Sequence, residues 1–123
     1  MVKVIVTGGR DFQSSAQVWS GMDMVHATLG ITELMQGGAK GVDQFAREWA
    51  TRHPEVKRYV CHAEWEKHGP SAGPIRNARM LEWEPDYVVA FEGGRGTANM
   101  VKLAEDACVP VIHIRGGKIE KWS

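Results

Sequence analysis

The chain has 123 residues, 43% hydrophobic and 24% charged, and its 15 basic and 15 acidic side chains cancel. This length suits one domain over residues 1–123, and no apolar run is long enough to cross a membrane. The zero net charge offers no field for non-specific nucleic-acid binding, so a nucleic-acid partner is not favoured.

Cysteine usage and the N-terminus indicate the compartment. Cys61 and Cys108 fall in or beside apolar segments, which predicts buried free thiols rather than a disulfide or a zinc site. Residues 1–6 lack a long apolar stretch followed by small residues, so no signal peptide is expected. We therefore expect a soluble, cytoplasmic protein.

The first half of the chain alternates between strand-like and helix-like patterns. Lys3–Thr7 is a short apolar run that ends in two glycines, as expected for a buried parallel strand. Ser14 or Ser15 caps a predicted helix that reaches about Leu29, where Gly30 stops it. The pattern continues with a strand at Thr32–Gln36, a helix at Gly41–His53 and a strand at Glu55–Cys61.

The second half begins with the only long loop, His62–Ala72, and then returns to regular elements. Pro74 suits the first turn of a helix that runs to about Trp83. The remaining expected elements are a strand at Asp86–Phe91, a helix at Ala98–Cys108 capped by Thr97, a strand at Pro110–Ile114, and an antiparallel edge strand at Lys118–Trp122 after the Gly116-Gly117 turn.

Strands that alternate with helices predict an α/β fold. We expect a single Rossmann-like, doubly wound and mostly parallel sheet of about five strands, with Lys118–Trp122 as an added antiparallel edge strand. Ligands of such folds bind beyond the carboxyl ends of the strands, and three glycine-rich turns stand there.

The turn after the fourth expected strand is the clearest anion site. Its glycines let the backbone approach a ligand, and unpaired N–H groups at the start of the following helix point at negative charge. The pattern predicts a phosphate-binding loop made of Gly93, Gly94, Arg95, Gly96 and Thr97, directly after Glu92.

The other two turns have a weaker signal. In the first, the amides of Gly8 and Gly9 would hold a phosphate, Arg10 would add a bidentate cation, and Asp11 would fix Arg10 or accept a ribose hydroxyl. A tight turn with a surface ion pair is the alternative. The second turn supplies Gly37, Gly38, Lys40, Gly41 and Asp43, of which Asp43 equally suits a simple complement to the helix dipole.

Side chains near the fourth expected helix complete the predicted site. Arg76 and Asn77 would reach the region above the sheet, whereas Arg79, on the same face as Arg76, equally suits a solvated surface. Trp65 would stack on a base or pack as a lid on its own domain. The loop histidines have no metal-ligand spacing, so neither a metal site nor another cofactor is expected.

The chain resembles the SLOG superfamily, named for the Smf/DprA and LOG proteins, in the order and spacing of three motifs: Gly37–Asp43, Arg76–Met80 and Gly93–Thr97. The resemblance covers Val4 to Ile114 and is closest to the branch of small YspA-like domains of phages and bacteria. It implies a Rossmann-like nucleotide-binding domain.

The LOG enzymes within that superfamily hydrolyse the N-glycosidic bond of nucleoside monophosphates. Their pattern is Arg-Lys-x-x-Met followed by Pro-Gly-Gly-x-Gly-Thr-x-x-Glu, and the Arg and the final Glu serve catalysis. Arg76 and Met80 match, but Asn77 replaces the Lys, Glu92 the Pro, and Met100 the catalytic Glu. Methionine neither stabilises an oxocarbenium ion nor activates water, so the departure at Met100 is serious.

Three functions follow as hypotheses. The first is a nucleotide-binding protein, a sensor or sequestering protein, that holds a nucleoside phosphate or an ADP-ribose-like ligand. The second is a phosphoribohydrolase with Arg76 and Glu92 as catalytic candidates, Asp11 or Asp43 being other sources of the carboxylate. The third is a DprA-like binder of single-stranded DNA. Helix faces carrying Trp19 or Trp49 would also allow a homo-oligomer.

Overall fold

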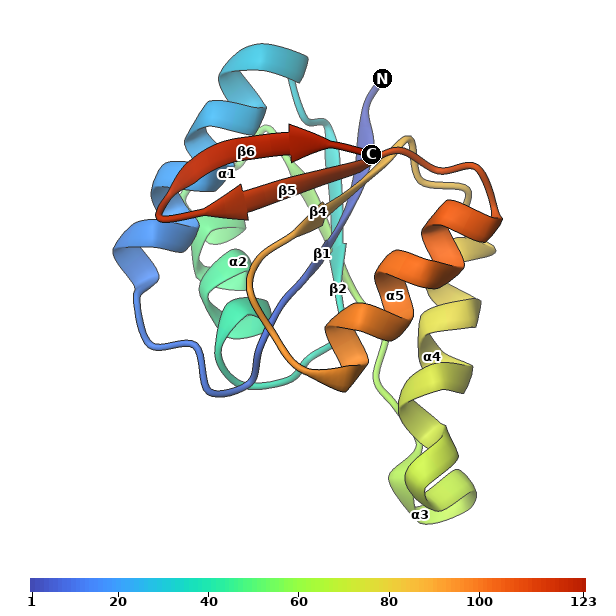
Figure 1. The fold of residues 1–123 in the computed structure, drawn as a ribbon. Coiled ribbons are helices and arrows are strands. Elements are labelled where there is room, and N and C mark those ends of the chain that lie inside the picture. The colour runs from blue at the N-terminus through green and yellow to red at the C-terminus, as the bar shows by residue number, and fades with distance from the viewer.

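The computed structural model, which describes residues 1–123, places six strands in one sheet (Figure 1). The strands are β1 (Lys3–Thr7), β2 (Glu33–Gln36), β3 (Lys57–Val60), β4 (Tyr87–Ala90), β5 (Val111–Arg115) and β6 (Lys118–Trp122). Their order is β3-β2-β1-β4-β5-β6, with β6 antiparallel to β5 and all other neighbours parallel. The predicted Rossmann-like sheet and its antiparallel edge strand are confirmed.

Helices cover both faces of this sheet. They are α1 (Ser15–Leu29), α2 (Val42–Thr51), α3 (Trp65–His68), α4 (Ala72–Leu81) and α5 (Arg95–Asp106), with a 3-10 turn at Gly69–Ser71. Figure 1 shows α1 and α2 on one side and α4 and α5 on the other. Because side chains alternate along a strand, Val4 and Val6 join the core under α1 and α2, whereas Ile5 joins the core under α4 and α5.

The two ends of α1 follow directly from local residue chemistry. The Ser14 hydroxyl accepts a hydrogen bond from the Gln17 amide at 3.2 Å, which is the geometry of an N-cap. Gly30 takes the left-handed conformation with a φ of 69°, and its amide donates to the His26 carbonyl. Both predicted signals for this helix are confirmed.

The start of α5 corrects the sequence prediction. The helix begins at Arg95, its N-cap is Gly94 without any side-chain hydrogen bond, and Thr97 lies inside the first turn. The prediction that Thr97 caps the helix is therefore wrong. The Ala98 amide donates to the Gly94 carbonyl at 3.0 Å, so backbone bonding extends the helix into residues whose types gave no helical signal.

Three further expectations need correction. The predicted loop His62–Ala72 contains α3 and the 3-10 turn. Cys108 is exposed and Cys61 half-buried, so the prediction of buried thiols is wrong. Trp49 is completely buried between α1, α2 and the sheet, so it is not available to join two copies of the chain.

None of the helices combines the length and apolar character that crossing a bilayer requires.

The topology creates a gap at the carboxyl edge of the sheet. From β1 the chain moves outward to β2 and β3, and then it returns to place β4 on the opposite side of β1. The connections after β1 and β4 therefore leave toward opposite faces. Such a switch point opens a crevice between the two connections, and it is the usual ligand site of this architecture.

Candidate functional site

A cleft of about 720 Å³ opens at this edge, between the loop after β1 and the first turns of α4 and α5. Its volume lies within the range of small-molecule sites. The predicted site residues that line it are Gly8, Gly9, Arg10, Asp11, Asp43, Trp65, Arg76, Asn77, Glu92, Gly93, Gly94, Arg95, Gly96 and Thr97. Residues from four separate segments of the chain are thus brought together.

The turn after β2 contributes less to the cleft surface than the sequence suggests. Gly37, Gly38, Lys40 and Gly41 do not line the cleft; only Ala39 and Asp43 of this turn do. A Cβ atom on Gly37 would collide with Arg76 and lie 2.9 Å from Oδ2 of Asp43. Gly41, with a φ of 72°, packs directly against the carbonyl of Gly9. These glycines make room for neighbouring groups instead of presenting their own amides.

The N-terminus of α5 offers a row of free donors. The amides of Gly94, Arg95, Gly96 and Thr97 donate no hydrogen bond within the protein, because the first helical bond comes from Ala98. The positive end of the helix dipole lies at the same place. A Cβ atom on Gly94 would have no atom within 4 Å, so the loop is open to the cleft. This arrangement suits an anion such as a phosphate.

Backbone hydrogen bonds of Gly9 join separate parts of the cleft wall. Its amide donates to the Glu92 carbonyl at 2.9 Å, and its carbonyl accepts from the Val42 amide at 3.2 Å. The peptide of Gly9 is therefore held between the loop before α5 and the start of α2. These bonds fix the spacing of the three glycine turns, which the sequence alone leaves undetermined.

Arg76 is anchored by most of its guanidinium group. Nη1 donates to the carbonyls of Gly37 at 2.6 Å and of Cys61 at 3.2 Å, and Nε donates to Oδ1 of Asn77 at 3.1 Å. Nη2 has no partner within the protein, and Arg76 is one of the residues that line the cleft. Burial lowers the pKa of Arg76, against which nearby Asp43 acts, and the group stays charged.

Asn77 acts as a tie between α4 and α5. It is buried, and its Nδ2 donates to the Gly96 carbonyl at 3.2 Å and to Oδ1 of Asn99 at 2.9 Å. Its oxygen accepts from Arg76, so the polar atoms of this predicted ligand contact are all engaged with the protein. Asn99, which sequence reasoning missed, lines the cleft beside it. The sequence prediction began this helix at Ala98, and a start at Arg95 is needed to place Asn99 on the face of α5 that lines the cleft.

Three carboxylates, Asp11, Asp43 and Glu92, face the cleft in different environments. Asp11 is exposed, and so is Glu92, which pairs with Nη1 of Arg115 at 3.6 Å. Asp43 is buried, and this burial raises its pKa, against the hydrogen bond from Ala39 and the charge of Arg76. Met100 is also buried, in the core under α4 and α5, and its side chain is not part of the cleft.

An aromatic wall closes one end of the cleft. The Trp65 side chain is 46% exposed, and the guanidinium carbon of Arg10 lies 5.0 Å from the centre of its ring. Phe12, Pro70 and Pro74 add apolar surface to the lining. A planar group of a ligand fits such a surface by stacking. No group of three His, Cys, Asp or Glu side chains is arranged to hold a metal ion.

Comparison with known proteins gives two matches. The family described as "YspA, cpYpsA-related SLOG family" matches residues 2–68. Over 124 aligned residues the chain is 34% identical to the Gene 61 protein of Mycobacterium phage D29, covering 92% of this chain and 96% of that protein. The family match includes the turns after β1 and β2, and the phage relative extends the similarity across the cleft.

Proposed function

This chain belongs to the YspA, cpYpsA-related SLOG family, and on that premise we propose that it binds a nucleotide in the cleft described above. The ligand is a nucleoside phosphate or an ADP-ribose-like molecule, which the protein senses or sequesters. The observation that carries the proposal is that the free amides of Gly94–Thr97 lie in the same cleft as the side chains of Arg76 and Arg10. These donors complement a phosphate.

The remaining surface of the cleft accommodates the other parts of a nucleotide. Trp65 and the neighbouring prolines offer an apolar face for the base. In the free protein Arg10 occupies part of that face, since its guanidinium group stacks on the Trp65 ring. A bound base would take over the ring, and Arg10 would then be available to the phosphate.

A phosphoribohydrolase is the second candidate, favoured by the carboxylates of Asp11, Asp43 and Glu92 in the same cleft as Arg76. Against it stands the place of Met100, which puts the position of the LOG glutamate in the core. Incubation with nucleoside monophosphates, followed by chromatography, tests this role. Release of free base by the wild type and not by Arg76→Lys would support it; intact substrate after long incubation would rule it out.

A thermal-shift assay with a panel of nucleotides tests binding, and Gly94 supplies a matched pair of variants. Gly94→Asp places a carboxylate beside the free amides, where it both caps α5 and repels phosphate. We expect this variant to fold normally and to lose the ligand-induced shift in melting temperature. Gly94→Ala adds only a methyl group in open space, so it should keep the shift.

The result that contradicts the proposal is equally clear. If no nucleoside monophosphate, diphosphate, cyclic nucleotide or ADP-ribose stabilises the wild type, the cleft does not hold this class of ligand. Mass spectrometry of small molecules retained through purification provides an independent check, because a co-purified nucleotide would identify the base and the number of phosphates.

A further inference from the structure

Asp43 is a buried carboxylate that the fold uses only in part. Its side chain lies in the first turn of α2 and the residue is only 6% exposed. Oδ2 accepts a hydrogen bond from the Ala39 amide at 3.2 Å, and the Gly37 amide adds a favourable interaction with the carboxylate. No side chain of the protein donates to this carboxylate, and Asp43 is one of the residues that line the cleft.

The structure alone does not explain why this carboxylate is buried. Asp43 takes part in none of the ion pairs, and the charges of Arg76 and Arg10 act on it only from a distance. An exposed carboxylate would complement the dipole of α2 equally well. Burying a carboxylate that has no ion-pair partner costs free energy, so a partner supplied by a ligand is the simpler explanation.

Arg76 supplies the complementary donor at the same place. A Cβ atom on Gly37 would touch both the Arg76 guanidinium and Oδ2 of Asp43, so both side chains lie close to this glycine, although they form no ion pair. Nη2 of Arg76 makes no hydrogen bond within the protein, and Arg76 and Asp43 both line the cleft. A hydroxyl group is the ligand group that accepts from one and donates to the other.

We infer that Asp43 accepts a hydrogen bond from a ribose hydroxyl of the bound nucleotide, while Arg76 donates to the same sugar. The inference rests on the proposed nucleotide binding and adds its substrate class: ribonucleotides, not nucleotides that lack the sugar hydroxyls. The sugar lies next to the phosphate in a nucleotide, and Gly9 holds the start of α2 beside the phosphate-binding loop. The base has its own surface at Trp65.

The stability of the free protein distinguishes this role from a structural one. Because burial raises the pKa of Asp43 above 3.8, the folded state binds its proton more tightly than the unfolded chain. Stability therefore falls as pH rises through the interval between the two pKa values, and ionised Asp43 destabilises the free protein at neutral pH. Asp43→Asn removes the charge but keeps an oxygen for Ala39. The free variant should melt at the same temperature as the wild type or higher.

The decisive experiment compares ribonucleoside monophosphates with their 2′,3′-dideoxy counterparts by isothermal titration calorimetry. We expect the dideoxy compound to bind the wild type about tenfold more weakly or worse, because Asp43 is then left without its partner. In Asp43→Asn this ratio should fall well below the wild-type value while the phosphate is still bound, because only Arg76 then keeps its full contact with the sugar. Glu48→Gln, on the exposed face of α2, is the control and should keep the wild-type ratio.

The other outcomes of this experiment distinguish a failure of the inference from a failure of the proposed function. Equal binding of the ribose and dideoxy compounds by the wild type overturns the inference and leaves the proposed function intact. A preference for ribose that is as large in Asp43→Asn as in the wild type overturns the assignment to this residue, as does a large fall in the melting temperature of the free variant. Failure of every nucleotide to bind the wild type is a failure of the proposed function itself.

Discussion

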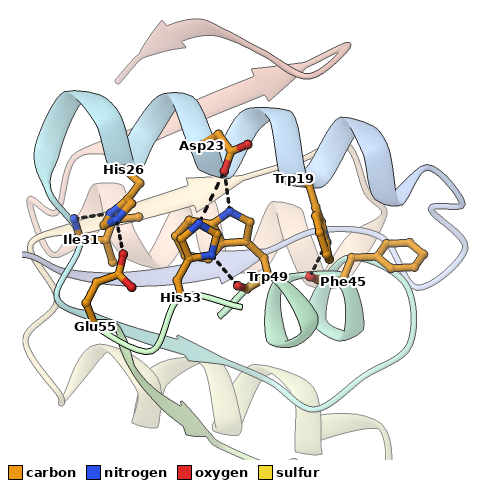
Figure 2. A network of polar contacts seen from close by, with 8 residues as sticks. All are labelled: Trp19, Asp23, His26, Ile31, Phe45, Trp49, His53 and Glu55. Atoms are coloured by element: carbon orange, nitrogen blue, oxygen red, sulfur yellow. Dashed lines mark hydrogen bonds and ion pairs between the residues drawn. The ribbon is translucent and has the colours of Figure 1, made fainter. Parts of the chain in front are cut away.

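Two polar regions of the molecule differ in how completely they are hydrogen-bonded. Between α1 and α2, the side chains of Asp23, His26, Trp49, His53 and Glu55 form what we call the α1–α2 network (Figure 2). Nε1 of Trp49 donates to Asp23 at 2.8 Å, and Nδ1 of His53 lies 2.7 Å from the Trp49 carbonyl. The His53 ring stacks on the Trp49 indole, with the ring centres 3.9 Å apart.

The end of this network near β2 is closed in the same way. Nδ1 of His26 accepts from the Ile31 amide at 3.1 Å, so the proton lies on Nε2, which donates to Glu55 at 3.1 Å. Both ring nitrogens of this histidine are therefore used within the protein. The hydrogen bonds of the α1–α2 network link α1 to α2 and to Glu55 after it, so they hold these parts of the fold together.

The cleft shows the opposite pattern, since donors there remain open. Nη2 of Arg76 and the amides at the start of α5 lack partners within the chain. This unused hydrogen-bonding capacity supports the proposal that the cleft is where a ligand binds.

Replacing the tryptophan of each region tests this comparison with the largest expected effect on stability. Trp49→Ala removes a completely buried indole and its bond to Asp23, which should destabilise the protein by about 3–5 kcal/mol in urea unfolding. Trp65→Ala, at the half-exposed wall of the cleft, should change stability by about 0.5 kcal/mol or less and weaken nucleotide binding. Equal losses of stability would refute the division into structural and binding regions.

A pair of glycines provides the next test. Gly41 and Gly30 both have positive φ, at 72° and 69°, but only Gly41 packs against backbone, at the Gly9 carbonyl. Gly41→Ala should cost about 2–4 kcal/mol from strain and collision. Gly30→Ala should cost about 1–2 kcal/mol from strain alone. Chemical denaturation measures both, and a Gly41 variant as stable as the Gly30 variant would show that the cleft walls are not rigidly joined.

The smallest effect concerns the charge of Glu55 in the α1–α2 network. Hydrogen bonds from its own amide and from His26 lower the pKa of Glu55 below 4.5. A lowered folded-state pKa stabilises the fold above the unfolded value and loses this contribution as pH falls through the folded value. Glu55→Gln should therefore melt slightly below the wild type at pH 7, and the difference should shrink as the pH falls through the folded-state pKa of Glu55. A difference that is constant across this range would exclude the charge as its source.

The sequence predicted those parts of the fold that depend on neighbouring residues. The Ser14 cap, the Gly30 stop and the Gly116-Gly117 turn each act within a few residues, and all are observed. The first turn of α5 was missed because the Gly94 carbonyl, not a side chain, begins it. Local residue preferences carry no signal for such a start.

The site shows where this limit lies. The sequence alone predicts the alternating α/β order, the family, and the glycine turns at the carboxyl ends of β1, β2 and β4. Only the tertiary structure decides that Gly37 and Gly41 support the cleft while Gly94 faces it, that Asn77 is a tie, and that Asp43 is buried beside Arg76. The physical reason is distance along the chain: Arg76 meets Gly37, and Gly9 meets Glu92, through contacts that no local pattern encodes.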